Sequence, residues 1–469
     1  MMIEEKVIAI KSIVGENNVS ADPEKLSEYF ESKVKAPGLT LVTPTEGSQV
    51  QELVKLASQH NIPIYTLRDR YCSEEVSSKE GILLDLSKIN QVFEVDSLNL
   101  HAIIGPGVTF PQLLGEIKRH DKNLKLAMPA CTDSNSVLHN YMRRNVTLLS
   151  PTLRGRTIIV SNYHIVLPLE GEVFKSGSHS ISEQDHVPDW PGTGGTAPSI
   201  AFYGMDDALG IPIKAVIWVF PVQECRRVMA VGFSDVSEAK SFLQDSCRKG
   251  RFIEAYLANS LFLSVILAKE GADIARARRE LPPWTAVGSL EGSEELVEVT
   301  KKALNESVKD LGGDEIKGDY LDLMTSSLER PWYVWDRDCY KGASRHIPFY
   351  TLFRRTPEFD KIFGASIEEK GYPPDEVGQL LIPLKQARSL YCEYDLYFEP
   401  GKEEKCAQIY NYSYEKLVRA GAFVDRPTGR VAELIYRQNP TIWELQRGIK
   451  KRLDPKGILN PDQLVAKEA

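Results

Sequence analysis

Apolar positions in the first part of the chain alternate between helical and extended periods. Leu39 to Pro44 reads as a strand that a proline ends, and a helix with one apolar stripe follows it. That stripe consists of Val50, Leu53, Val54 and Ala57. After His60-Asn61 the chain runs Ile62-Pro63-Ile64, which is typical of a short buried strand. A loop that follows a helix and a buried strand commonly meets a ligand, often a phosphate group.

The same patterns predict the elements of the next hundred and fifty residues. Strands are expected at residues 81–86, 91–95 and 100–105, and a glycine-rich turn then precedes a helix over 111–120. A loop-rich stretch follows, with strands at 163–167, 172–176 and 213–220. Pro221 ends the last of these strands, and we place a domain boundary there. The order of elements is α+β, and no G-x-G-x-x-G follows the first strand to suggest a simple dinucleotide-binding βαβ fold.

Residues 223–420 are predicted to form a second unit of alternating helices and strands. Helices are expected at 237–248, 293–311 and 403–420, and strands of one sheet at 347–353, 379–384 and 388–398. Because side chains alternate along a strand, one face of the last strand carries Tyr391, Glu393, Asp395 and Tyr397. A turn at residues 453–461 would bring the tail back to the first domain.

Composition excludes two classes of partner. Hydrophobic residues make up 42% of the 469 and charged residues 26%, as in an ordinary globular protein of two or three domains. The net charge is 57 − 65 = −8, which gives no electrostatic support to a nucleic-acid partner. No apolar run approaches the roughly 20 residues of a membrane span, and the N-terminus is not a signal peptide. We therefore expect a cytoplasmic protein without a transmembrane segment.

Neither the seven cysteines nor the eight histidines form a metal-binding motif. The sequence contains no Cys-x-x-Cys, no His-x-x-x-His and no His-Glu-x-x-His. An odd, scattered set of cysteines is typical of reduced thiols in a cytosolic protein. The sequence therefore predicts no metal site.

Several short motifs, taken in order, resemble the vanillyl-alcohol-oxidase family of FAD-linked oxidases, which share a PCMH-type FAD-binding domain. The matching segments are Pro44 with its helix, Ile62-Pro63-Ile64, Gly105-Pro106-Gly107-Val108, residues 204–211, Gly371-Tyr372-Pro373, Arg388 to Glu393 and Asp454 to Pro461. The resemblance implies a two-domain α+β fold. Residues 1–222 would be the FAD-binding domain, residues 223–420 an inserted α/β substrate-binding cap, and residues 421–469 a segment that returns to the FAD-binding domain.

The resemblance also implies FAD as the cofactor and assigns positions to it. The positions near FAD would be Gly105, Gly107, Val108, Ser136, Gly210, Ile211 and Asn460. Two family positions differ here: His139 replaces a glycine close to the flavin, and Arg68, Asp69 and Arg70 stand roughly where a glycine-rich loop would lie against the diphosphate.

Two interpretations of the Arg68 to Arg70 stretch remain open. Its two guanidinium groups could neutralise a diphosphate directly, because guanidinium binds phosphate in a bidentate manner. Alternatively, the loop has lost its ligand, and the arginines pair with Asp69, Glu74 or Glu75 at a solvated surface. Asp69 beside a diphosphate would repel it.

The substrate side of the site differs as well. Relatives often place a histidine before the glutamate of the last cap strand, where this chain has Tyr391. A tyrosine could act as an acid or a base there, with Glu393 and Arg388 orienting the substrate. The alternative is that Tyr391 and Glu393 are half-buried strand residues with ordinary hydrogen bonds. Arg345-His346 would be strand residues, the histidine with a structural role.

Two functions follow from the resemblance. The first is an FAD-linked oxidoreductase that oxidises an alcohol, a hydroxy acid or a phenolic or benzylic small molecule by hydride transfer to flavin. The second is a flavin-free structural or regulatory subunit of an oligomer, paired with an active paralogue or with an electron-transfer protein. Flavin absorbance of the purified protein separates the two.

Overall fold

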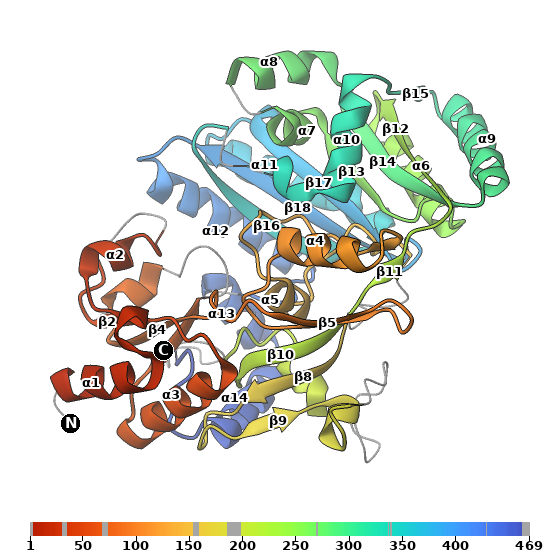
Figure 1. The fold of residues 1–469 in the computed structure, drawn as a ribbon. Helices are drawn as coiled ribbons and strands as arrows, with labels where there is room; N and C mark the ends of the chain where they lie inside the picture. Colours follow the sequence, from red (N-terminus) through yellow and green to blue (C-terminus); the bar gives the residue numbers. More distant parts are fainter. Residues whose placement is uncertain are drawn as a thin grey trace.

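The structure of the chain is a computed structural model, and it describes residues 3–30, 35–67, 74–152, 159–184, 198–268, 271–335, 337, 340–427 and 429–461. Figure 1 shows two lobes, one above the other. We call the part built around the sheets of β1 to β11 the N-terminal lobe, and the part built around the sheet of β12 to β18 the central lobe.

The N-terminal lobe begins with a four-stranded sheet of order β1-β2-β4-β3. Its strands are β1 (Val19–Ser20), β2 (Leu39–Val42), β3 (Ile64–Leu67) and β4 (Gly81–Asp85). Strands β2, β4 and β3 are parallel, and α3 (Gly47–His60) connects β2 with β3. The predicted stripe of α3 is fully buried against Ile64 and Ile82 of the sheet, together with α1 (Ile3–Val14). The short helix α2 (Pro23–Ser27) packs in a separate small cluster.

A five-stranded antiparallel sheet of order β5-β6-β10-β8-β9 completes this lobe. The strands are β5 (Val92–Asp96), β6 (His101–Ile104), β8 (Val160–Val166), β9 (Val173–Lys175) and β10 (Ile211–Trp218). Its core lies against α4 (Phe110–His120) and α5 (Val137–Met142). A short pair, β7 (Leu124–Lys125) and β11 (Phe220–Pro221), leads to the central lobe.

The central lobe is a seven-stranded antiparallel sheet of order β15-β12-β14-β13-β17-β18-β16. The strands are β12 (Cys225–Phe233), β13 (Ala255–Asn259), β14 (Trp284–Gly292), β15 (Asp314–Glu315), β16 (Ala343–Thr351), β17 (Val377–Leu384) and β18 (Ser389–Phe398).

Helices pack on both faces of this sheet. One face is covered by α6 (Val236–Arg248), α9 (Glu294–Asp310), α11 (Thr356–Glu369) and α12 (Glu403–Arg419). The other face is covered by α7 (Ser260–Leu267), α8 (Gly271–Glu280) and α10 (Asp319–Glu329). Leu148 of the N-terminal lobe packs into the second group, so this face also meets the neighbouring lobe.

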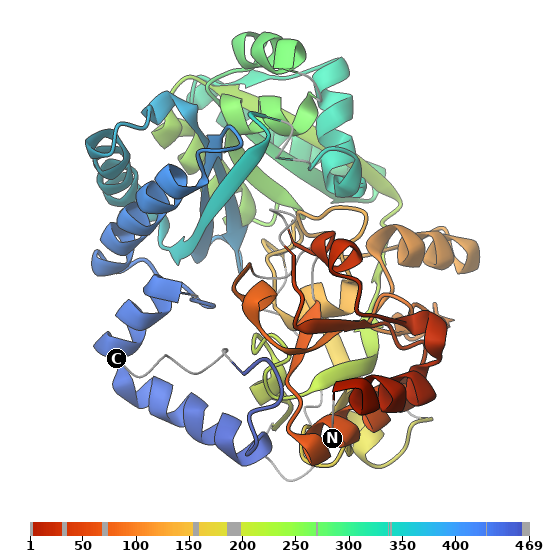
Figure 2. The same ribbon diagram turned by 90° about the vertical axis from the view of Figure 1, so that its left-hand side faces the viewer.

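After the central lobe the chain returns to the N-terminal lobe through two sparsely buried helices. They are α13 (Gly429–Gln438) and α14 (Pro440–Leu453), and Figure 2 shows them beside the N-terminal lobe. Leu459 forms a parallel bridge with Ile64 at the start of β3. The return of the tail predicted from residues 453–461 is confirmed.

The predicted strands 379–384 and 388–398 are confirmed within a residue or two, as neighbours in one sheet with β16. Strands β12, β14 and β13, which occupy the second to fourth places of that sheet, were not predicted separately. None of the helices in the described ranges is long and apolar enough to cross a membrane.

Candidate functional site

The end of β3 is held by the side chain of Asn460. The Thr66 backbone N–H donates to Asn460 Oδ1 at 3.1 Å, and Asn460 Nδ2 donates to Thr66 Oγ1 at 3.0 Å. The same amide nitrogen lies 3.4 Å from the backbone oxygen of Asp206. Asn460 therefore joins three segments that are far apart in the sequence, at the point from which the chain continues toward Arg68.

A buried lysine joins the returning tail to the segment that contains Asp206. Lys450 Nζ donates to the backbone oxygens of Ala208 and Leu459 and to Asp454 Oδ2, each at 2.6 Å. The two carboxylate oxygens of Asp454 accept the backbone N–H groups of Ile458 and Leu459 at 2.9 Å each. Burial lowers the pKa of Lys450, and Asp454 opposes that effect. The lysine was missed from the sequence because it reads as one of several basic residues at the end of a helix.

The segment around α5 is connected to the Gly105–Val108 turn. Ser136 caps α5 by accepting the His139 backbone N–H at 3.1 Å, and its hydroxyl donates to the backbone oxygen of Pro106 at 2.5 Å. The backbone N–H of Val137 donates to the backbone oxygen of Val108 at 2.9 Å. These bonds bring two of the predicted cofactor-binding segments side by side.

His139 faces the segment that contains Gly210 and Ile211. Its Nε2 lies 3.3 Å from Asp207 Oδ2, and both side chains are buried. One turn later, Arg143 Nε lies 2.9 Å from Asp206 Oδ1. The histidine that replaces a family glycine is thus paired with a carboxylate of the same lobe.

Backbone strain gathers in this region. Arg144, Asp206, Asp207 and Asn460 are non-glycine residues with positive φ angles of 57°, 47°, 57° and 39°. Such conformations are costly for residues with a Cβ, and they concentrate at ligand sites, where the surrounding structure holds them. The four residues belong to the segments that Asn460, His139 and Arg143 join.

The glycines at 105 and 107 have a structural explanation that needs no cofactor. A Cβ at Gly105 would lie 2.4 Å from the backbone oxygen of Ile89, and one at Gly107 would lie 2.4 Å from that of Ser87. Gly210 is equally confined, since a Cβ added there would lie 2.3 Å from Ile165 Cγ2. These glycines are required by the packing of the chain on itself. Arg68, Asp69 and Arg70 lie outside the described residues.

A cavity of about 570 Å³ lies between the two lobes. We call it the interlobe cavity, and its described lining is Tyr141, Arg144, Asn145, Val146, Thr147, Ser150, Ile159, Tyr350, Thr351, Leu352, Arg355, Leu384, Lys385, Ser389, Gly421 and Phe423. Backbone bonds between the lobes hold its shape: Lys385 N donates to the Ser150 oxygen at 3.0 Å and Ala255 N to the Leu148 oxygen at 3.0 Å. The volume suits a flat ring system or a small substrate.

A row of polar side chains begins beside this cavity and runs along one face of β18. Ser389 lines the cavity, and Tyr391, Glu393 and Asp395 follow at alternate positions, as the sequence predicted. The ring of Tyr391 contacts that of Tyr350, a lining residue, with centroids 5.4 Å apart. Tyr391 donates its hydroxyl hydrogen to Glu393. The row therefore connects the cavity wall with the interior of the central lobe.

Arg337 and His346 complete the row, which we call the β18 polar row: Arg337, His346, Tyr391, Glu393 and Asp395. The Arg337 guanidinium contacts Glu393 and lies 3.4 Å from Asp395 Oδ2. His346 Nδ1 lies 2.8 Å from Asp395 Oδ1. Arg337 was missed because it comes from a stretch without a clear hydrophobic period, whereas His346 was predicted to be structural.

Protonation in the row follows from burial and from these contacts. Burial and the nearby Glu393 raise the pKa of Tyr391 well above its ordinary value, so the phenol keeps its proton at neutral pH. Burial would lower the pKa of Arg337, but Glu393 and Asp395 hold it above its ordinary value. Burial also opposes the charged forms of His346 and Asp395. Each of the two charges nevertheless stabilises the other, so the pKa of His346 is raised and the pKa of Asp395 is lowered.

Arg388 is placed apart from Tyr391 and Glu393. It is exposed in the turn between β17 and β18, and its backbone N–H donates to the Leu384 oxygen at 3.0 Å. The sequence grouped the three residues by spacing along a strand, but the strand begins only at Ser389. The role proposed for Arg388 stays a prediction.

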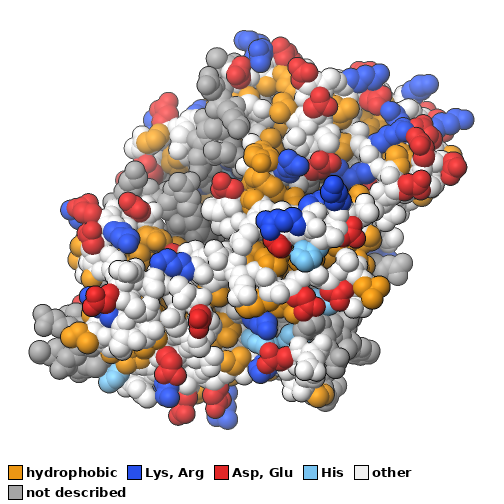
Figure 3. All heavy atoms as spheres, in the orientation of Figure 1, with side chains coloured by type: hydrophobic (Ala, Val, Ile, Leu, Met, Phe, Trp, Pro, Cys, Tyr) orange, Lys and Arg blue, Asp and Glu red, His pale blue; other side chains and the backbone are white. Residues whose placement is uncertain are grey.

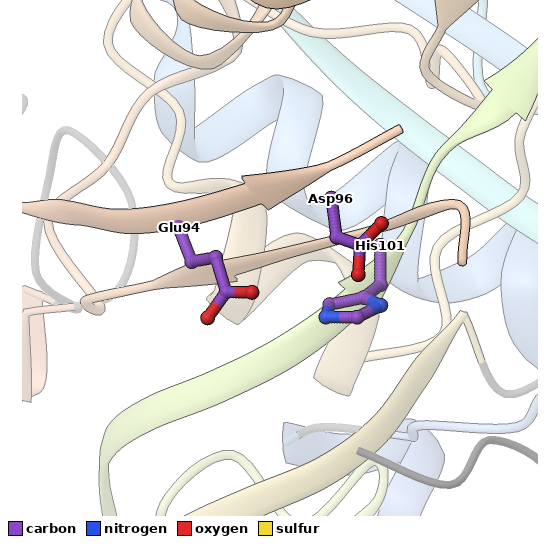
Figure 4. A group of neighbouring side chains, drawn as sticks. All are labelled: Glu94, Asp96 and His101. Carbon is purple, nitrogen blue, oxygen red and sulfur yellow. The ribbon is translucent and has the colours of Figure 1, made fainter. Parts of the chain in front are cut away.

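Two groups of described residues bring a histidine and two carboxylates within 4.8 Å of one another. In one group, His346 with Glu393 and Asp395, the guanidinium of Arg337 already supplies the positive charge. The other, Glu94, Asp96 and His101, lies on β5 and β6 (Figure 4). There the carboxylate of Asp96 accepts the backbone N–H groups of Leu98 and Asn99 at 2.8 Å each and closes the turn between the strands.

Comparison with known proteins identifies the cofactor domain. Residues 39–138 match the family model described as an FAD binding domain. The matched range covers α3, the Gly105–Val108 turn and the cap of α5. The described segments that meet at Asn460 and His139 fit such a cofactor, because strained backbone converges there and one of the strained residues, Arg144, lines the interlobe cavity.

Three relatives extend the likeness to almost the whole chain. The flavoprotein subunit of 4-cresol dehydrogenase [hydroxylating] from Pseudomonas putida is 22% identical, over 96% of this chain and 93% of that protein. Glycolate oxidase subunit GlcD of Bacillus subtilis is 19% identical over 92% and 89%. The crystal structure of p-cresol methylhydroxylase with substrate bound superposes with a TM-score of 0.84 at 20% identity, covering 98% and 96%.

Proposed function

We propose that this chain, which belongs to the FAD-linked oxidases with a PCMH-type FAD-binding domain, oxidises a small alcohol, hydroxy acid or phenolic substrate in the interlobe cavity. The observation that carries the proposal is the β18 polar row, in which the ring of Tyr391 contacts that of Tyr350 at the wall of that cavity. Relatives named for cresol and for glycolate oxidation support the substrate range. The flavin-free alternative has no comparable support.

Bound FAD would supply the acceptor for a hydride that leaves the substrate carbon. The segments that would hold it carry Thr66, His139, Asp206, Asp207 and Asn460, and in the sequence Arg68 to Arg70 follow shortly after Thr66. The chain's own task at the substrate is then to bind it, to exclude water and to accept the proton that its hydroxyl group loses.

The β18 polar row can accept that proton. Because its pKa is raised, Tyr391 is protonated at neutral pH. Its hydroxyl donates a hydrogen bond to Glu393, whose charge Arg337 balances. When a substrate hydroxyl gives up its proton toward Tyr391, the Tyr391 proton moves to Glu393, so the phenol remains neutral throughout. Tyr391 and Glu393 thus act as a proton path, while Arg388, at the exposed turn, would orient a substrate carboxylate as it approaches.

We propose residues 222 and 420 as the boundaries of the FAD-binding domain, the substrate cap and the returning segment, since β11 ends at Pro221 and α12 at Arg419. A partner is also part of the proposal. The 4-cresol dehydrogenase relative is a flavoprotein subunit, and an electron-transfer subunit would let this chain pass electrons to another protein. The rate at which reduced protein is reoxidised by oxygen, compared with a c-type cytochrome, tests whether a protein acceptor is preferred.

Anaerobic mixing of the FAD-loaded protein with candidate substrates tests the function. We expect a hydroxy acid or a 4-alkylphenol to abolish the visible absorbance of bound flavin within a single turnover. Retention of full flavin absorbance with every small alcohol, hydroxy acid and 4-alkylphenol tested would refute the proposal. A flavin-free protein that takes up no added FAD would instead support the structural-subunit alternative.

A further inference from the structure

The interlobe cavity is lined by cations and, among the described residues, by no carboxylate. Arg144 comes from the N-terminal lobe, while Arg355 and Lys385 come from the central lobe. The rest of the described lining is aromatic, aliphatic or uncharged polar. This contrasts with the whole chain, whose net charge is −8, and with the face in Figure 3, where side chains of both signs are intermixed. The cavity is therefore a local site of positive charge in an acidic protein.

The three cationic side chains differ in the partners that they already have. Arg355 binds Glu358 through two nitrogens at 3.1 and 3.0 Å and donates to the Ala420 oxygen at 2.6 Å. The guanidinium of Arg144 lies over Gly204, and a Cβ added at Gly204 would be 3.0 Å from Arg144 Nη2. The side chain of Lys385 is exposed and makes no hydrogen bond or ion pair with any residue that the structure describes. Lys385 is therefore available to a ligand.

The backbone that carries Lys385 is strained and held in place. Lys385, Gln386 and Ala387 have φ angles of 52°, 57° and 57°, three successive left-handed conformations without a glycine. The Lys385 and Gln386 N–H groups donate to the oxygens of Ser150 at 3.0 Å and Pro151 at 2.7 Å. Such strain persists only where surrounding contacts impose it, and here they fix the Cα of Lys385 at the cavity.

We propose that the interlobe cavity takes substrates that carry a carboxylate on a flat apolar body, and that Lys385 binds the carboxylate. This inference rests on the proposed function, because it selects a substrate class for the same cavity. The aromatic rings of Tyr141, Tyr350 and Phe423 line the space that the apolar body would fill. Of the two chemistries in the names of the relatives, the acid is then the better match, and an uncharged cresol is a poor one.

Two isosteric ligands and two lysines test the inference by calorimetric titration of the FAD-loaded protein. 4-Hydroxybenzoate and 4-hydroxybenzamide have nearly the same shape, but only the first is an anion. Lys361 provides the control: it is exposed on α11 of the same lobe and, like Lys385, has no side-chain partner among the described residues. The variants are Lys385→Glu and Lys361→Glu, which make the same change of charge.

We expect the unmodified protein to bind the benzoate about tenfold more tightly than the benzamide. Lys385→Glu should weaken benzoate binding on the order of 30-fold and change benzamide binding by less than about twofold. Lys361→Glu should change either affinity by less than about twofold. Equal affinities for the two ligands, or equal effects of the two variants, would overturn the inference.

Flavin reduction separates this inference from the function on which it rests. If 4-methylphenol bleaches the flavin but anion selectivity is absent, the oxidase function stands and the inference falls. If the benzoate binds in a Lys385-dependent manner while neither hydroxy acids nor phenols bleach the flavin, the anion site stands and the proposed function falls.

Discussion

The two sides of the site use buried charge in different ways. At the junction of the N-terminal lobe with the returning tail, Lys450 is satisfied by two backbone oxygens and one carboxylate. In the β18 polar row, by contrast, the hydrogen-bond partners of Arg337 among the residues that the structure describes are ionisable side chains. A charge satisfied by backbone groups fixes the position of segments, whereas one balanced by titratable side chains can also take part in proton transfer. The following predictions test that distinction.

Replacing Lys450 should have the largest effect on stability. Lys450→Met leaves Asp454 buried without its counter-charge and deprives two backbone oxygens of their donor, so we expect a loss of about 3–5 kcal/mol in the free energy of unfolding. Urea denaturation measures it. Lys451→Met changes the neighbouring exposed lysine and should cost less than about 0.5 kcal/mol. Equal effects of the two variants would show that the tail is held by other contacts.

Replacing Arg337 should cost slightly less and should depend on pH. Arg337→Met leaves Glu393 and Asp395 close together in the interior, and we expect a loss of about 3 kcal/mol at pH 7. The loss should shrink as the pH falls, because Asp395, whose pKa is held low against burial by His346 and Arg337 in the unmodified protein, then takes up a proton and the repulsion is relieved. Arg354→Met, at an exposed position of the same lobe, is the control. A loss that does not change with pH would mean that packing, not charge, sets the cost.

Removing the Tyr391 hydroxyl should affect chemistry more than stability. Tyr391→Phe interrupts the proton path to Glu393, and we expect the rate constant of flavin reduction to fall about 100-fold. The measurement is anaerobic stopped-flow mixing with a saturating substrate. Tyr412→Phe is a matched control, since the Tyr412 hydroxyl also donates to a glutamate, Glu369, but at the surface. Equal rates for Tyr391→Phe and the unmodified protein would exclude this residue from the proton path.

The smallest expected effect is a pH dependence that originates at His346. Its pKa is raised in the folded protein, where burial and Arg337 oppose its charge but Asp395 favours it. A group with a raised folded pKa stabilises the fold fully below its unfolded pKa, near 6.5, and that contribution is lost as the pH rises through the folded pKa. We expect the unfolding free energy to decline as the pH rises above 6.5, by less than about 1 kcal/mol because the His346 side chain is 37% exposed, and we expect no such decline in His346→Gln. If the unfolding free energy of His346→Gln declines with pH as steeply as that of the unmodified protein, the decline comes from another group.

The sequence predicts the fold better than it predicts the site. Period-two alternation placed Tyr391, Glu393 and Asp395 on one face, and the structure has them there. The turn at residues 453–461 was also predicted to bring the tail back to the first domain, and the structure has Leu459 bridged to Ile64 there. By contrast, the cofactor role that the resemblance implies for Gly105 and Gly107 stays a prediction, and the close approach that the structure shows there is to Ile89 and Ser87.

The residues missed were those defined by long-range contact. Lys450 reaches Ala208, 242 positions away in the sequence, and Arg337 reaches Glu393, 56 positions away. No local period marks either residue, because the partners of Lys450 meet only when the tail packs on the N-terminal lobe, and those of Arg337 meet only when the sheet of the central lobe forms. Lys385 was missed for a related reason: its position at the cavity depends on hydrogen bonds to Ser150 and Pro151 of the other lobe.

Determining the FAD content of the purified protein tests the account most directly. Cofactor released by denaturation is measured against protein concentration, after incubation with excess FAD and removal of the unbound excess. The account predicts about one FAD per chain, with the Arg68 to Arg70 stretch as it stands in the sequence. A protein that retains no FAD, and that gains it when Arg68, Asp69 and Arg70 are each replaced by glycine, would contradict the account.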